Sequence, residues 1–291
     1  NAGAFTRIGQ SANRLALGNS GVASAAHGAS FFYSPSAVLF QKKSIFGAHL
    51  QMLAFDRRVY SLGYHKIIEK RKTFQISLGW IHATVNDLYE FNGEAEKGEA
   101  IEFGSNAFHA SIGLLLTNSF GLSFTGKYYL ESISDYFKHT YKASGFSLDI
   151  SGMYKVSGLT NIGFMLKDIN GSIVTNSDKV FEENIRSAKE LTMNIPTQWM
   201  IGVDSEDVFN WIGLSNLRLS ADVKYFKLLT SVHVGIESSH FRYGKLRLGY
   251  DRNHFNFGFG TETGLFKIDY AFLSSFYGEG ESHVLTTSVY L

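Results

Sequence analysis

SFGLSFTGKYYLES (residues 119–132) and SGFSLDISGMYKVS (residues 144–157) are two segments in which apolar and polar side chains alternate, separated by a polar tip. One face of the first segment carries Phe120, Leu122, Phe124 and Tyr128, and the other carries Ser123, Thr125 and Lys127. A period of two indicates β-strands with one apolar and one polar face. The pattern returns along the chain in runs of about ten residues, a length that suits a tilted strand crossing a bilayer.

The composition fits a large antiparallel β-structure. The chain of 291 residues contains 25 Phe, 15 Tyr and 29 Gly but only 2 Pro, and proline interrupts strand pairing. The absence of cysteine excludes disulfides, thiolate metal sites and cysteine nucleophiles. A net charge of +1 gives no indication of nucleic-acid binding. A mean hydropathy of -0.05, without a long apolar run, excludes a helical membrane protein.

Residues 1–43 differ from the rest of the chain because they are rich in Ala, Ser and Gly and show no long alternation. We expect a compact arm with short helical turns, since Phe5, Leu15 and Phe32 would be exposed in a flexible tail. Pro35 marks a turn before the first strand. The chain begins with Asn1, which is compatible with a removed signal peptide.

The same arm resembles the start of the PorV/PorQ family of outer-membrane barrels, which belong to the wider FadL-like class. The residues that match the family's opening pattern are Arg7, Gly9, Arg14, Gly18, Gly21, Ser34 and Pro35. Ser34 and Ser36 replace the usual Asn and Ala around that proline. The resemblance implies a plug formed by residues 1–43 inside a transmembrane barrel formed by residues 44–291. It also implies a protein without enzymatic activity or cofactor.

The rest of the chain predicts about fourteen strands joined by alternating short and long connections. An even number of antiparallel strands with apolar residues facing outward is typical of outer-membrane barrels. The first long loop, residues 85–105, is acidic, and the second, residues 171–196, carries a helical spacing of apolar residues around 177–191. The final strand reaches the C-terminus, so we expect it to pair with the first and close the barrel.

Charges on the polar faces are expected to point into the lumen, because a charge facing lipid costs about 2–4 kcal/mol at the bilayer midplane. They are Lys127, Asp149, Lys155, Arg218, Asp222, Lys224, Glu237, Lys245, Arg247, Lys267 and Asp269. Because both signs are mixed, a salt-bridged interior packed against the plug is the simpler interpretation. The alternative, functional interpretation is that these charges line a permeation path or a ligand pocket. The tyrosines near strand ends are typical of an interfacial girdle.

Three functions follow from these observations. The resemblance favours a protein-binding component of an export or cell-surface assembly in a Gram-negative outer membrane, contacting envelope or secreted proteins through loops 85–105 and 171–196. The first alternative is FadL-like uptake of a hydrophobic small molecule, and the second is a structural anchor of a surface complex. The sequence contains no HExxH or GxSxG motif, so we predict neither a zinc enzyme nor a serine hydrolase. An apolar lumen pocket would favour uptake, and apolar loop surface would favour a protein partner.

Overall fold

The computed structural model describes residues 2–24, 32–86, 88–91, 97–101, 103–134, 140–176, 190–208, 216–239, 244–252, 254–274 and 280–291. The helical elements are η1 (Ala4–Arg7), α1 (Ala12–Ala16) and α2 (Pro35–Val38). The strands are β1 (Ile45–Met52), β2 (Arg57–Glu69), β3 (Thr73–Val85), β4 (Tyr89–Phe91), β5 (Lys97–Ala100), β6 (Phe103–Thr117), β7 (Phe120–Ser134), β8 (Thr140–Lys155), β9 (Thr160–Asn176), β10 (Glu190–Ile195), β11 (Gln198–Glu206), β12 (Leu217–Phe226), β13 (Leu229–Ser238), β14 (Gly244–Asp251), β15 (His254–Thr263), β16 (Phe266–Leu273) and β17 (Ser282–Tyr290).

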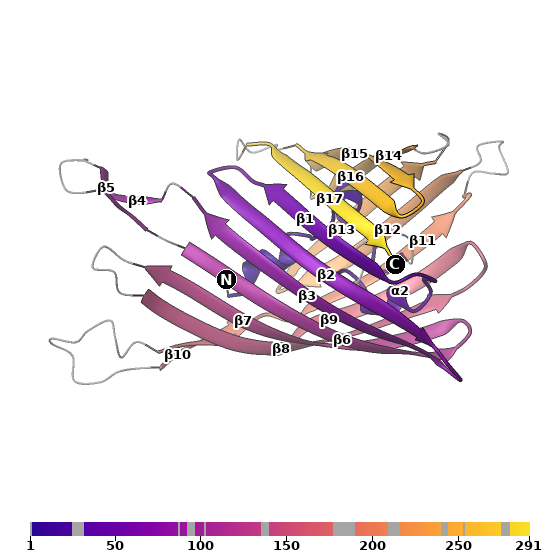
Figure 1. The fold of residues 1–291 in the computed structure, drawn as a ribbon, viewed down its shortest axis with the longest axis horizontal. Coiled ribbons are helices and arrows are strands. Elements are labelled where there is room, and N and C mark those ends of the chain that lie inside the picture. Colours follow the sequence, from indigo (N-terminus) through magenta and orange to yellow (C-terminus); the bar gives the residue numbers. More distant parts are fainter. Residues whose placement is uncertain are drawn as a thin grey trace.

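The long strands form one closed antiparallel β-barrel of 14 strands (Figure 1), which confirms the predicted fold class. The first and last strands pair in register from Ile45 with Tyr290 to Met52 with His283. The pairing of β8 with β9 completes the circle. Closure leaves no long strand with an unpaired edge in this part of the chain, which is a requirement for β-structure in lipid.

The two faces of the barrel wall reverse the usual distribution of side chains. On β12, Val223 and Tyr225 are 48% and 43% exposed, whereas Asp222 and Lys224 are buried. Phe257 on β15 is exposed in the same way. An exposed apolar band over buried charges is stable where the surrounding medium is hydrocarbon rather than water.

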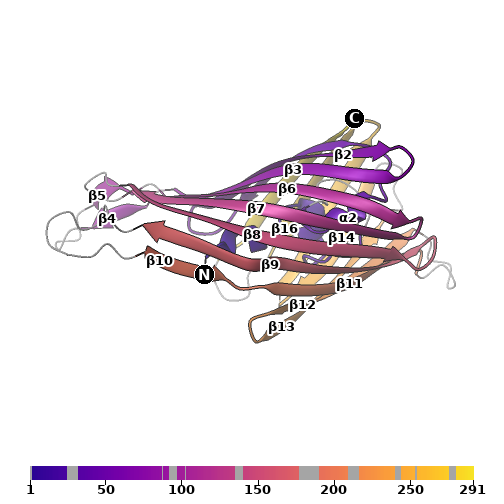
Figure 2. The same ribbon diagram turned by 90° about the horizontal axis from the view of Figure 1, so that it is seen from below.

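The N-terminal segment, residues 2–24 and 32–41, lies within the ring of strands (Figure 2). Helix α1 contacts β14, β15, β16 and β17, and α2 contacts β6, β7 and β8. The apolar side chains of the N-terminal segment, such as Leu15 and Phe32, are buried. None of the helices in the described ranges is long and apolar enough to cross a membrane.

Both predicted long loops contain strand, which corrects the sequence interpretation. The ribbon β4–β5 occupies part of 85–105, and β6 begins at Phe103. In the second loop, β9 continues to Asn176 and pairs with β10. Asn170–Gly171 is a turn signal in sequence, but here it belongs to an irregularity inside a continuous strand. Most of the helix predicted at 177–191 falls outside the described residues.

Candidate functional site

The N-terminal segment lies against inward-facing glycines of the wall. A Cβ atom built on Gly249 would be 2.0 Å from the Gly18 backbone nitrogen, and one on Gly235 would be 2.5 Å from Leu17. A Cβ on Gly163 would be 2.5 Å from the Val22 carbonyl oxygen. Any larger residue at these positions would displace the segment, so the wall is shaped to the backbone that it holds.

Polar side chains of the strands bind the backbone of the same segment. Asp222 accepts hydrogen bonds from the N–H groups of Gly21 and Val22 at 2.7 and 3.1 Å. On β13, His233 Nδ1 lies 2.8 Å from the Gly18 carbonyl oxygen, and on β15 the Asn256 side chain donates to the Leu15 carbonyl oxygen at 3.0 Å. Further contacts join Lys224 to the Asn19 carbonyl and Thr286 to the Ala12 N–H, and Arg218 donates to the Ser24 side-chain hydroxyl.

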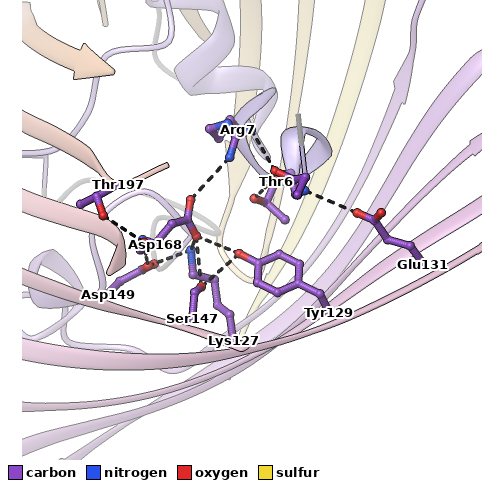
Figure 3. A network of polar contacts seen from close by, with 11 residues as sticks. Thr6, Arg7, Lys127, Tyr129, Glu131, Ser147, Asp149, Asp168 and Thr197 are labelled. Atoms are coloured by element: carbon purple, nitrogen blue, oxygen red, sulfur yellow. Dashed lines mark hydrogen bonds and ion pairs between the residues drawn. The ribbon is translucent and has the colours of Figure 1, made fainter. Parts of the chain in front are cut away.

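A buried polar network surrounds Asp168, on the inner face of β9 (Figure 3). Asp168 pairs with Lys127, which also contacts Asp149 at 2.7 Å. The hydroxyls of Tyr129 and Ser147 donate to the same Asp168 oxygen at 2.8 and 3.1 Å. These donors satisfy a carboxylate that would otherwise be costly to bury.

The geometry of β9 places Asp168 in this network. Between Phe146 and Ile150 of β8, the register against β9 slips twice, so β9 contains extra residues. Asp168 and Asn170 in this irregularity have positive φ angles of 59° and 49°. The Asp168 N–H donates to the Asp149 carboxylate at 2.8 Å. The hydroxyl of Thr197, in the break between β10 and β11, donates to the backbone carbonyl oxygen of Asp168. The irregularity is therefore held by hydrogen bonds from β8 on one side and from the break between β10 and β11 on the other.

Arg7 joins the N-terminal segment to this network. Its Nη1 atom lies 3.7 Å from Asp168 Oδ2, and its guanidinium stacks over the Phe226 ring at 4.9 Å. Burial lowers the pKa of Arg7 from its ordinary value, while the Asp168 carboxylate acts in the opposite direction. With Lys127 and Lys167, Arg7 brings three basic groups to the two carboxylates Asp149 and Asp168.

A hollow of about 30 Å³ lies between the N-terminal segment and the wall. The described residues lining it include the basic residues Arg7, Lys167, Lys224 and Arg252, and no acidic residue. The others are Thr6, Gly9, Gln10, Asn19, Phe32, Tyr33, Gln198 and Met200. Such a volume holds about two water molecules, so it accommodates a small anionic group but not a large molecule.

Another group of buried charges lies on β13, β14 and β16. Arg247 bridges Glu237 at 2.6 Å and Asp269 at 2.8 Å, and Lys267 pairs with Asp269 at 3.0 Å. All four side chains are buried. This group has the paired character of a structural interior.

The structure places the predicted residues as follows. Most of the predicted lumen charges are buried on the inner face, namely Lys127, Asp149, Arg218, Asp222, Lys224, Arg247, Lys267 and Asp269. Lys155 is only half-buried, at the rim, where its Nζ lies 4.7 Å from the Phe40 ring centroid. Among the residues that match the family's opening pattern, Arg14 is buried, and Gly9, Gly18 and Gly21 have positive φ angles. Ser34 and Pro35 begin α2.

Sequence reasoning missed Asp168, Lys167 and His233. Asp168 and Lys167 are adjacent, so alternation puts them on opposite faces, and only the irregularity in β9 turns both inward. His233 carries a signal that was available, because it alternates with Val232 and Val234 on a clear strand. In the described part of the chain, no group of three or more His, Cys, Asp and Glu residues is arranged to hold a metal ion.

The chain is similar in fold to solved outer-membrane channels. It matches the CymD monoaromatic hydrocarbon channel with a TM-score of 0.67 and 10% identity, over 98% of this chain and 97% of that one. The toluene transporter TodX of Pseudomonas putida gives 0.64 and 12%, over 97% and 98%. A FadL homologue of Pseudomonas aeruginosa gives 0.61 and 10%, over 96% and 97%. No protein-family model matches the sequence, and no curated protein matches it.

These similarities define the class of protein: a closed antiparallel barrel of 14 strands that matches FadL-like outer-membrane barrels. The FadL-like part of the predicted resemblance is thereby confirmed at the level of fold. The narrower PorV/PorQ assignment finds no support, because all three neighbours are FadL-type channels or transporters. None of the three bears the name of an enzyme.

Proposed function

We propose that this chain is a transporter of hydrophobic small molecules in the outer membrane of a Gram-negative bacterium. The similar barrels carry the names of hydrocarbon channels, which supports uptake over the protein-binding role that the PorV/PorQ resemblance implies. The similarity of the whole barrel to these channels is the single observation that carries the proposal. The hollow at Arg7, Lys167 and Lys224, where the N-terminal segment meets the wall, is lined by basic rather than apolar side chains, and it bears on the polar end of the substrate.

The lining of this hollow favours a substrate with an apolar body and an anionic head. Three buried or half-buried basic side chains, with Gln10 and Gln198 as further donors, suit a carboxylate. Phe32 and Met200 provide apolar contact beside them. Because the hollow is small, an entire substrate passes only when the N-terminal segment shifts. We therefore propose that residues 1–43 act as the plug of a barrel formed by residues 44–291.

Uptake into proteoliposomes tests the proposal. The substrates are a labelled long-chain alkyl carboxylate and the neutral alcohol of the same chain length. Wild-type protein is expected to admit the carboxylate faster than the alcohol, and Lys167→Gln is expected to reduce that preference. Lys155→Gln is the matched control, because Lys155 lies at the rim against Phe40. If both compounds enter the proteoliposomes no faster than they enter empty liposomes, the proposed transport function is refuted.

The predicted protein partner has no support in the comparisons and remains a prediction. Residues 87, 92–96 and 102 of the first loop and residues 177–189 of the second lie outside the described residues. Purification from native outer membrane distinguishes the two functions. A stoichiometric envelope or secreted protein bound to the barrel, together with absent uptake, would favour the export or anchor role.

A further inference from the structure

The outer face of the barrel has a hollow where small side chains replace large ones. Ala110 on β6 and Gly126 on β7 are directly paired, and Leu78 and Leu148 lie on either side of them in the same row. All four belong to the outward face, because the inward positions of these strands alternate with them. The small pair leaves a depression in an otherwise bulky apolar surface.

Aromatic residues form one wall of this hollow. Trp80, Phe108, Tyr128 and Phe146 are paired in register across four strands, one row from Ala110 and Gly126. The hollow has a volume of about 610 Å³. A neighbouring hollow of about 330 Å³, with Ala48 and Thr287 among its lining, shares Leu62 and Trp80 with the first. The two hollows are therefore adjacent on the outer face of β17, β1, β2, β3, β6, β7 and β8, and together we call them the groove.

Polar groups cluster at one end of the groove. Asn106 Oδ1 accepts from Trp80 Nε1 at 3.0 Å and lies 3.0 Å from His82 Nδ1. The His82 ring stacks on Trp80 and on Tyr60. Arg58 is exposed on the same face of β2, one outward position beyond Tyr60. A cation and hydrogen-bonding rings thus adjoin an apolar groove, as an amphipathic ligand requires.

We propose that this groove binds one phospholipid of the surrounding bilayer, with an acyl chain along Ala110 and Gly126 and the phosphate near Arg58 and His82. The proposal rests on the proposed membrane location. Charge complementarity favours an anionic headgroup beside Arg58. A flexible acyl chain fills a local depression, whereas the wall of a second barrel, itself covered with bulky outward residues, would bridge over it.

Native mass spectrometry of protein extracted in a mild detergent tests this binding. The protein is incubated with phosphatidylglycerol or with diacylglycerol of the same acyl chains, and retained lipid is counted. The wild type is expected to retain one phosphatidylglycerol and little diacylglycerol. Ala110→Leu with Gly126→Leu fills the groove and is expected to weaken retention about tenfold. A Cβ at Gly126 contacts only the Phe146 ring, at 3.6 Å, so the backbone at this position has room for a side chain.

Two further variants keep the test interpretable. Arg58→Gln, at an exposed position, is expected to lower retention of phosphatidylglycerol without changing that of diacylglycerol. Ala221→Leu, on the outward face of β12 far around the barrel, is the matched control and is expected to retain lipid as the wild type does. Equal retention by all variants would overturn the proposal, as would a dimer that the groove-filling variant abolishes. Lipid retention is independent of uptake, so failed transport with specific retention would refute only the proposed transport.

Discussion

The carboxylate of Asp222 accepts a 2.7 Å hydrogen bond from the backbone N–H of Gly21, a residue 201 positions earlier in the chain. The same oxygen accepts from Val22 at 3.1 Å. Asp222 is 1% exposed, so both N–H groups would lack an acceptor if this side chain were removed. The wall therefore recognises the backbone of the N-terminal segment rather than its side chains at this point.

Replacing Asp222 by alanine is expected to loosen the N-terminal segment. The loss of each hydrogen bond to a charged acceptor corresponds to about 1.5–3 kcal/mol of unfolding free energy. Limited proteolysis followed by mass spectrometry should show earlier cleavage before residue 43, together with a lower Tm. Asp222→Asn keeps one acceptor oxygen and should have a smaller effect. Identical cleavage of the alanine variant and the wild type would show that the contact does not hold the segment.

Replacing Gly249 by valine is expected to displace the segment from the lumen. The space permits no side chain there, because a Cβ would lie 2.0 Å from the Gly18 nitrogen and 2.4 Å from the Leu17 carbonyl carbon. Single-channel conductance in planar bilayers should therefore rise relative to the wild type. Gly158→Val is the control, since a Cβ on Gly158 meets nothing within 4 Å. Unchanged conductance in both variants would contradict the idea that the segment obstructs the lumen.

Replacing Asp168 by asparagine is expected to destabilise the barrel by about 3 kcal/mol, because it removes one partner of a buried ion pair. Asparagine tolerates the positive φ at this position, so the change tests charge rather than backbone shape. Denaturant unfolding in detergent micelles measures the effect. Glu206→Gln serves for comparison, because Glu206 is 52% exposed and 3.7 Å from Arg218, and its loss should cost less than about 1 kcal/mol. Equal losses would mean that burial does not set the strength of these pairs.

Trp199 is expected to face the acyl chains of the bilayer. It is 57% exposed on the outward face of β11, between the buried residues Gln198 and Met200. Lipids brominated along their acyl chains should quench its fluorescence, whereas acrylamide in the aqueous phase should not. The contribution of Trp199 is isolated by comparison with Trp199→Phe. Stronger quenching by acrylamide than by brominated lipid would show that this face meets water.

Much of the architecture was predictable because its signal is local. Residues 217–226 alternate between the two faces in sequence, and β12 buries Arg218, Asp222 and Lys224 as the alternation predicts. The β9 strand shows where this reasoning stops. The adjacent residues Lys167 and Asp168 both point inward, against the period of two, because extra residues interrupt the pairing with β8. A residue pattern read one strand at a time contains no information about such a register shift.

The sequence by itself determined that the chain consists of long alternating strands whose charges lie on one face and whose aromatic residues lie on the other. That property depends only on the backbone period and on side-chain polarity. The tertiary structure alone decided which charges meet: Lys127 with Asp149 and Asp168 across three strands, and Asp222 with the backbone of Gly21. These partners are set by strand register and by the path of the N-terminal segment through the lumen. Both arise from the closure of the whole barrel, which no single stretch of sequence specifies.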